Sequence, residues 1–185
     1  MPEKTLRSAK EAMDKALEAL SREFSTVRTG KATPALLDQV RVEAYGSLMS
    51  LKQVANVGAP EPQMLLVQPY DPNIAGAIAN AIRTADLGLN PSADGGLVRV
   101  PIPPLTEERR KEMVKVLHRM AEDGRVSVRH TRHEARDRLH AMQKEGDIGE
   151  DVCRRKESEL QEMTDAHVKR IDEMLAAKEA EVMTV

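Results

Sequence analysis

The chain has 185 residues, of which 41% are hydrophobic and 31% are charged, and its formal net charge at pH 7 is −2. This length suits one domain or two small ones. Its only aromatic residues are Phe24, Tyr45 and Tyr70, so any core must be aliphatic. No apolar run approaches the roughly 20 residues of a membrane span, and the start lacks the features of a targeting peptide. The lone cysteine, Cys153, excludes an internal disulfide, so we expect a cytoplasmic protein.

Charge is distributed unevenly along the chain. Residues 31–104 hold only five of the 28 lysines and arginines and none of the five histidines. The flanking segments are therefore charge-dense, and the middle is charge-poor. We interpret this difference as two bodies of different character, one formed by residues 1–30 with 105–185 and the other by residues 31–104.

The N-terminal flank has the spacing of an amphipathic helix. Its apolar residues recur at intervals of three, four and seven, which places them on one face of a helix. We expect this helix to end near Thr29–Gly30, because glycine commonly follows the last turn of a helix. The apolar face consists of Leu6, Met13, Leu17, Leu20, Phe24 and Val27.

A second helical pattern begins at Thr106 and continues to Gly146. Thr106 has the side chain of a helix cap, and the two glutamates after it would face the positive end of the helix dipole. Asp123–Gly124 could be a turn, but the apolar repeat keeps its phase across this pair. We therefore predict one helix of about 40 residues, about 60 Å long. Gly124 would lie on its apolar face at a cost of about 1 kcal/mol.

A third helical pattern follows residue 147. Three long amphipathic helices are not stable alone in water, so we expect them to pack as a bundle. His167 falls on the apolar face of the third helix, where a packing role is the simplest interpretation. This face consists of Leu160, Met163, His167, Ile171, Met174 and Val182.

The middle segment predicts a mixed body of strands and a helix. Val40, Val42 and Ala44 alternate with polar residues before a hairpin turn at 45–47, and residues 64–67 have the pattern of a short buried strand. Asp71–Pro72 would open a helix with a cap and a proline at its first position. We expect a turn at 92–96 and a final strand at 97–102. The predicted fold class is α+β: a long three-helix bundle with an inserted small β/α/β domain.

The chain crosses between the two predicted bodies twice, and both crossings contain residues that restrict the backbone. The prolines between 101 and 104 cannot donate backbone hydrogen bonds and favour a stiff, extended connector. Two adjacent crossings would make a hinge with a restricted swing. The expected hinge residues are Gly30, Lys31, Pro34, Pro101, Pro103 and Pro104.

Four arginines form a second stripe on the predicted long helix, beside the apolar one. Arg125, Arg129, Arg132 and Arg136 are spaced by four, three and four residues, which gives a stripe about 16 Å long. Guanidinium groups suit phosphate oxygens, so the stripe favours RNA binding through the backbone. No aromatic residue accompanies it, which argues against base stacking. The alternative is a solvated helix face whose arginines form ion pairs.

Motifs of catalysis and metal binding are not found in the sequence. The segment His130–Glu134 matches neither HExxH nor HxxEH, and an arginine between the histidines opposes a divalent cation. Cys153 has no neighbouring histidine as a partner base, so we interpret it as a spare thiol. There is no P-loop, GxGxxG or GxSxG motif. We therefore expect no metal, no cofactor and no enzymatic activity.

Four segments together resemble the bacterial ribosome recycling factor family, and the similarity spans the whole chain. They are Arg28–Pro34, Ala85–Pro91, Arg99–Lys111 and Lys178–Glu181. The resemblance implies a three-helix bundle that carries an inserted β/α/β domain in an L shape. It also implies that Arg28, Arg129 and Arg132 match the arginines with which the family binds RNA.

The resemblance implies a translation factor without catalytic activity. Such a factor would bind the large subunit of the post-termination ribosome through ribosomal RNA. Elongation factor G with GTP would then act on it, and the subunits would separate. We expect a monomer that binds neither DNA nor membranes. The competing hypothesis is a coiled-coil adaptor or chaperone with an inserted protein-binding module, and an enzyme ranks third.

Overall fold

The computed structural model describes residues 2–184, which divide into two compact units. One unit comprises residues 2–28 and 107–184, and the other comprises residues 29–106. The boundaries predicted from the sequence, after residue 30 and before residue 105, lie within two residues of this division. None of the helices in residues 2–184 combines the length and the apolarity that a membrane crossing requires.

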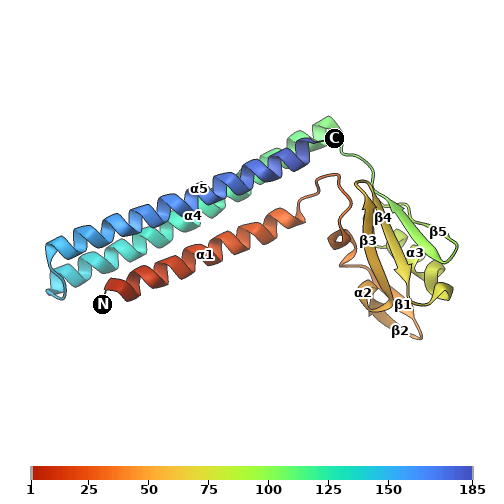
Figure 1. Cartoon of the computed structure of the whole chain (residues 1–185), viewed down its shortest axis with the longest axis horizontal. Helices are drawn as coiled ribbons and strands as arrows, with labels where there is room; N and C mark the ends of the chain where they lie inside the picture. Colours follow the sequence, from red (N-terminus) through yellow and green to blue (C-terminus); the bar gives the residue numbers. More distant parts are fainter. Residues whose placement is uncertain (1, 185) are drawn as a thin grey trace. The chain divides into compact units, whose positions relative to one another are not determined.

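The first unit is a bundle of three long helices: α1 (Pro2–Thr26), α4 (Glu107–Glu145) and α5 (Glu150–Met183). In Figure 1, α1 and α5 run in the same direction and α4 runs opposite to both. Helix α4 continues through Gly124, as the phase of the apolar repeat predicts. The core of the bundle is aliphatic, with Met13, Leu117, Val128, Leu139, Leu160 and Ile171 fully buried.

Gly124 lies where all three helices of the bundle come together. A Cβ atom at this position would lie 3.2 Å from Cδ2 of Leu20 on α1 and 3.5 Å from Cδ1 of Ile171 on α5. The glycine thus weakens the helix locally but leaves room for two side chains that are themselves buried. Its position in the core follows the prediction from the sequence.

The turn between α4 and α5 ends the long helix with a local hydrogen-bond pattern. Gly146 has a φ of +83°, which glycine adopts without strain. Its N–H donates to the carbonyl of Gln143, and the N–H of Asp147 donates to the carbonyl of Met142. This arrangement satisfies carbonyls that have no partner within the helix and reverses the chain into α5.

His167 of α5 is buried and links two helices of the bundle. Its Nδ1 donates to the carbonyl of Met163 at 2.7 Å, and its Nε2 lies 2.8 Å from Oδ1 of Asp14 on α1. Hydrogen bonds from Lys10 and then from His167 hold the pKa of the Asp14 carboxyl below its usual range. The packing role expected for His167 is therefore confirmed, with a polar bond between α1 and α5 added to it.

The second unit contains a four-stranded antiparallel sheet, a two-stranded hairpin and one helix of ten residues, α3 (Ala75–Thr84). The hairpin joins β1 (Arg41–Ala44) to β2 (Ser47–Ser50). The larger sheet has the order β3-β4-β6-β5. Its strands are β3 (Ala55–Glu61), β4 (Met64–Pro69), β5 (Ser92–Asp94) and β6 (Leu97–Pro101). Three short helical turns complete the unit: η1 (Pro34–Leu37), α2 (Leu51–Val54) and η2 (Pro72–Ile74).

Local sequence accounts for the ends of several elements in this unit. Tyr45 and Gly46 both have positive φ, as the turn of a tight β-hairpin requires. The side chain of Asp71 accepts a hydrogen bond from the backbone of Asn73, with Pro72 at the first helical position, as predicted. Ile78 and Ile82 of α3 belong to one buried apolar cluster with side chains of the sheet, including Leu65, Val67, Val98 and Val100.

Two edge strands differ from the sequence-based prediction. The sequence predicts a turn over residues 92–96, but Ser92–Asp94 pairs with β6 as strand β5, and the turn is confined to Gly95–Gly96. Strand β3 is not predicted at all. Both strands lie at the edges of the sheet, and β5 is exposed throughout. Strand β5 and residues 58–61 of β3 are exposed on both faces, so they lack the alternation of buried and exposed residues on which strand prediction rests.

The position of Gly124 generates a stability prediction. Gly124→Leu should lower the free energy of unfolding by about 1–3 kcal/mol, because the added side chain must displace Leu20 or Ile171. Gly76→Leu in α3 is the matched control, because no atom lies within 4 Å of its Cβ position. Chemical denaturation of both variants checks this. Equal stability of the two variants would contradict the close packing at Gly124.

Candidate nucleic-acid interface

The four arginines of the predicted stripe lie on α4 beside α5. Arg125 contacts Asp172, Arg132 contacts Gln161, and Arg136 contacts Glu157. The partner numbers fall as the arginine numbers rise, because the two helices are antiparallel. The stripe thus follows the line along which α4 and α5 meet, and we call these four arginines the arginine row.

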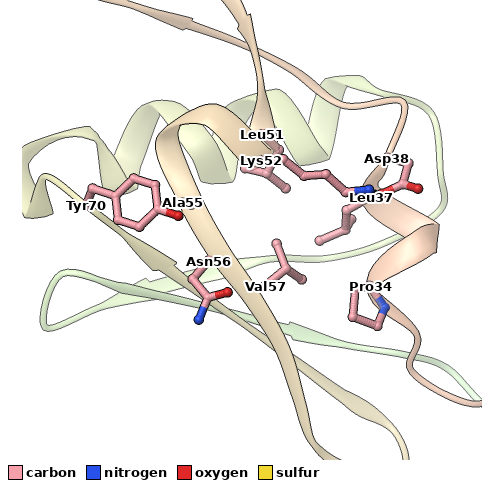
Figure 2. Close-up of a pocket in the computed structure, with 9 residues that line it drawn as sticks. All are labelled: Pro34, Leu37, Asp38, Leu51, Lys52, Ala55, Asn56, Val57 and Tyr70. Carbon is pink, nitrogen blue, oxygen red and sulfur yellow. Dashed lines mark ion pairs between the residues drawn. The ribbon is translucent and has the colours of Figure 1, made fainter.

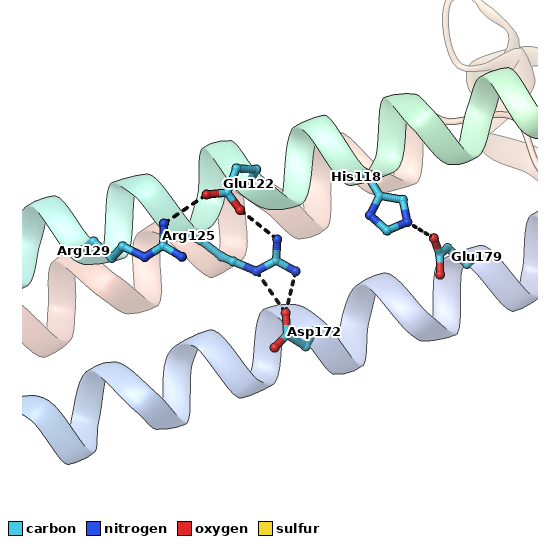
Figure 3. A network of polar contacts seen from close by, with 6 residues as sticks. All are labelled: His118, Glu122, Arg125, Arg129, Asp172 and Glu179. Atoms are coloured by element: carbon cyan, nitrogen blue, oxygen red, sulfur yellow. Dashed lines mark hydrogen bonds and ion pairs between the residues drawn. The ribbon is translucent and has the colours of Figure 1, made fainter.

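Arg125 is held by two carboxylates within the bundle. Its Nε donates to Oδ1 of Asp172 at 3.0 Å, and its Nη1 donates to Oε2 of Glu122 at 3.0 Å. Its side chain is only 18% exposed. The bonds to Asp172, which outweigh the opposing effect of burial, raise the pKa of the guanidinium further. Arg125 therefore cross-links α4 to α5, as Figure 3 shows.

Arg129 shares the carboxylate of Glu122 with Arg125. Its Nη1 donates to Oε1 of Glu122 at 3.0 Å, and its side chain is half exposed. The hydrogen bond from Arg125, and to a lesser extent the one from Arg129, lowers the pKa of the Glu122 carboxyl. Figure 3 also shows His118 of α4 in contact with Glu179 of α5, a further polar contact between these helices.

Arg132 is held by a neutral group. Its Nη1 donates to the amide oxygen of Gln161 at 3.0 Å, and Nε2 of Gln161 donates to Oδ1 of Asp165 at 2.8 Å. Within residues 2–184, the structure shows no carboxylate paired with Arg132. Arg132 is thus the member of the row whose charge is not offset by a direct ion pair.

Arg136 shares its acceptor with a histidine. Oε1 of Glu157 accepts from Nε of Arg136 at 3.1 Å and lies 2.7 Å from Nε2 of His140. Arg132 and Arg136 border an open hollow of about 270 Å³ between α4 and α5, which Leu160, Gln161 and Glu157 complete. The hollow thus has two guanidinium groups and one carboxylate at its rim.

The observed contacts of the arginine row match one of the two interpretations considered from the sequence. Three of its arginines form internal ion pairs with carboxylates, as the alternative of a solvated helix face expects. Ion pairs between exposed side chains are worth only about 0–1 kcal/mol, so they leave room for exchange with a phosphate. Arg129 and Arg136 are exposed enough for such exchange, whereas Arg125 is largely enclosed.

Some of the residues predicted at the two crossings belong to helical turns or strands, and others lie outside them. Arg28 is exposed, two residues beyond the end of α1, and Gly30 has a φ of +76°. Pro34 begins η1 and Pro101 ends β6, so both belong to regular elements of the second unit. The remaining predicted hinge residues, Lys31, Pro103 and Pro104, are exposed and lie outside helices and strands.

Both crossings are anchored to the same turn of the second unit. The N–H of Ala32 donates to the carbonyl of Pro62 at 2.7 Å, and the N–H of Ile102 donates to the carbonyl of Gln63 at 2.8 Å. Pro62 and Gln63 form the turn between β3 and β4. These two hydrogen bonds fix the points at which the chain enters and leaves the second unit.

Other candidate groups in residues 2–184 lie outside the arginine row. In the described part of the chain, no cluster of three or more histidine, cysteine or acidic side chains could hold a metal. Cys153 is buried. Its burial, and to a lesser extent the nearby charge of Glu157, raises the pKa of its thiol.

The second unit contains an open hollow of about 250 Å³, shown in Figure 2, which Tyr70 and Asn56 help to line. Its charged groups, Asp38 and Lys52, pair with each other at 2.9 Å and are exposed.

The structure thus defines a class of protein: a three-helix bundle with a row of arginines, interrupted in sequence by a small sheet unit. A family model described as "Ribosome recycling factor" matches residues 20–183. The chain belongs to the ribosome recycling factor family, and so it is a translation factor by family. This confirms the resemblance inferred from the four segments.

Relatives match the chain over its full length. A ribosome-recycling factor of Rubrobacter xylanophilus is 54% identical over 97% of both chains, and one of Bacillus subtilis is 46% identical over 100% of both. A solution structure of a ribosome recycling factor covers 100% of this chain and 98% of its own, with a TM-score of 0.76 and 38% identity. These likenesses confirm the predicted α+β fold class.

A second solved structure concerns a functional complex. It describes models of the Thermus thermophilus ribosome recycling factor and the Escherichia coli elongation factor G bound to the E. coli post-termination complex. Its matching chain has a TM-score of 0.65, 42% identity and full coverage of both chains.

The acceptors on α5 were not found from the sequence. Asp172, Gln161 and Glu157 oppose the arginine row only because the α4–α5 turn and the apolar core fix the register of the two helices. The spacing of Glu157 and Gln161 by four residues gives one face of a helix, which is a weak signal on its own.

The enclosed position of Arg125 generates a second prediction. Arg125→Ala and Asp172→Ala should show a coupling free energy of about 0.5–1 kcal/mol in a double-mutant cycle of unfolding, because the pair joins two helices. The exposed pair Arg170–Glu173 within α5 is the control, with an expected coupling of about 0.3 kcal/mol. Equal coupling in the two cycles would show that Arg125 is not a cross-link.

Proposed function

We propose that this chain acts with elongation factor G and GTP to separate post-termination ribosomes into subunits and release them from mRNA. The full-length similarity to ribosome recycling factors carries this proposal. A structure described as that factor with elongation factor G on the post-termination complex supports it further, because the matching chain is 42% identical to this one.

In this proposal the bundle binds ribosomal RNA of the large subunit through the arginine row and Arg28. Arg132 is the principal phosphate contact, since its guanidinium is held without an ion pair. Arg129 and Arg136 contribute by exchanging their carboxylate partners for phosphate oxygens. Arg125 acts mainly as a support, because its bonds to Asp172 and Glu122 fix α4 against α5.

The second unit, in the same proposal, is an arm that elongation factor G moves. The two crossings form the hinge, and the anchors of Ala32 and Ile102 to the β3–β4 turn limit its pivots to Gly30, Lys31, Pro103 and Pro104. Pro34 and Pro101 stiffen the edge of the arm instead, since they belong to η1 and β6. A double crossing lets the arm swing while both units stay folded.

The chain needs no catalytic residue in this proposal, because the partner GTPase would supply the free energy. The hollow of the second unit agrees with the proposed lack of a catalytic residue. Its charged side chains, Asp38 and Lys52, are exposed and pair with each other. We propose a cytoplasmic monomer without metal or cofactor. Subunit separation of post-termination ribosomes, measured by density-gradient sedimentation with elongation factor G and GTP, tests the function directly. Ribosomes that stay intact with and without this chain would refute it.

A third prediction concerns Arg132. Arg132→Ala should weaken binding to the large subunit about tenfold at low salt, because it removes one charge-assisted phosphate contact. The slope of the logarithm of affinity against the logarithm of salt concentration should fall by about one. Arg138→Ala removes the same charge roughly 120° away around α4 and should change affinity little. Equal effects of the two substitutions would contradict a specific role for Arg132.

A fourth prediction concerns the prolines of the second crossing. Replacing Pro103 and Pro104 together with glycine should broaden the distribution of interdomain orientations, because proline restricts the backbone of this exposed segment. Small-angle scattering measures this distribution. Pro60→Gly is the control, because Pro60 lies within β3, and it should leave the scattering unchanged. A distribution that stays as narrow in the double variant as in the natural chain would contradict the hinge.

A further inference from the structure

One of the four arginines in the row is held by a neutral acceptor, and the other three are held by carboxylates. Arg125, Arg129 and Arg136 each donate to a carboxylate, from Asp172, Glu122 or Glu157. Arg132 donates to the amide of Gln161. The amide fixes the guanidinium by a hydrogen bond but brings no negative charge into direct contact with it.

The orientation of the Gln161 amide is itself determined. Its Nε2 donates to Oδ1 of Asp165, one turn further along α5, at 2.8 Å. An ionised carboxylate only accepts hydrogen bonds, so the NH₂ group must face Asp165 and the oxygen must face Arg132. The order Arg132–Gln161–Asp165 is therefore a directed chain of hydrogen bonds, in which Asp165 orients the amide and the amide orients the arginine.

Gln161 has a charged counterpart one helical turn away. Glu157 lies four residues before it on the same face of α5 and holds Arg136, as Gln161 holds Arg132. Both residues line the open hollow between α4 and α5. The two side chains have nearly the same shape and differ by one charge, so the hollow offers a matched comparison between a neutral and an anionic acceptor.

We propose that Gln161 is a positioning residue for RNA binding, which acts by orienting Arg132 toward a phosphate without neutralising it. The inference rests on the proposed function, in which Arg132 contacts ribosomal RNA. A carboxylate at position 161 would pair with Arg132, and an incoming phosphate would have to displace it against like-charge repulsion. A fixed guanidinium also binds without the entropy loss of ordering a long side chain.

The test exchanges the two acceptors. Gln161→Glu should weaken binding of the full chain to isolated large subunits about tenfold and reduce the salt slope by about one, because it pairs Arg132. Gln161→Ala should weaken binding by only about twofold to threefold with the salt slope unchanged, since Arg132 keeps its charge and loses its support. Glu157→Gln should leave affinity equal or higher, by up to about threefold, because it frees Arg136.

The double variant, with Gln161→Glu and Glu157→Gln together, has the net charge of the natural chain. It should bind within about threefold of Gln161→Glu alone and stay weaker than the natural chain, because the unpaired charge has moved from Arg132 to Arg136. Recovery of natural affinity by the double variant would overturn the inference, since only the total charge would then matter. Thermal unfolding of each variant separates a loss of affinity from a loss of fold.

Arg132→Ala distinguishes the failure of this inference from the failure of the proposed function. Weaker binding of Arg132→Ala with natural binding of Gln161→Glu would overturn the positioning role and leave the RNA contact intact. Natural binding by both variants would overturn the RNA contact of Arg132 itself. Weaker binding by both, with the slope reduced in each, is the result we expect.

Discussion

The packing of α4 against α5 is the constraint on which the bundle depends. A helix of 39 residues with an apolar stripe is not stable alone in water, and its stability comes from the core that it shares with α1 and α5. The same packing fixes the register of the two antiparallel helices. Register in turn decides which acceptor faces each arginine, so Arg132 faces the amide of Gln161 while Arg136 faces the carboxylate of Glu157.

In the proposed function, the arginine row must satisfy two opposing requirements. Its guanidinium groups need acceptors that hold them in place, and they need uncompensated charge to attract phosphate. Arg125 lies at one extreme, with two carboxylates and little exposure, and serves the bundle. Arg132 lies at the other, held by a neutral group. In the proposed function, a graded row of this kind combines stability of the bundle with affinity for RNA.

Both crossings are attached to one turn of the second unit. Backbone hydrogen bonds from Ala32 and Ile102 attach both crossings to the turn between β3 and β4. Each crossing therefore enters the unit at a fixed point of the sheet. In the proposed function, a partner that pushes on the second unit would move it as one body. Ala32 and Ile102 would move with it, because both are hydrogen-bonded to its β3–β4 turn.

The sequence determined the three helices, the continuity of α4 through Gly124 and the row of arginines, because each follows from the 3.6-residue period of one helix. It also determined the family, through segments such as Arg99–Lys111. Only the tertiary structure decided the pairing of each arginine and the edge strands β3 and β5. Helix register and strand pairing arise from contacts between residues far apart in the chain, and local spacing contains no information about such contacts.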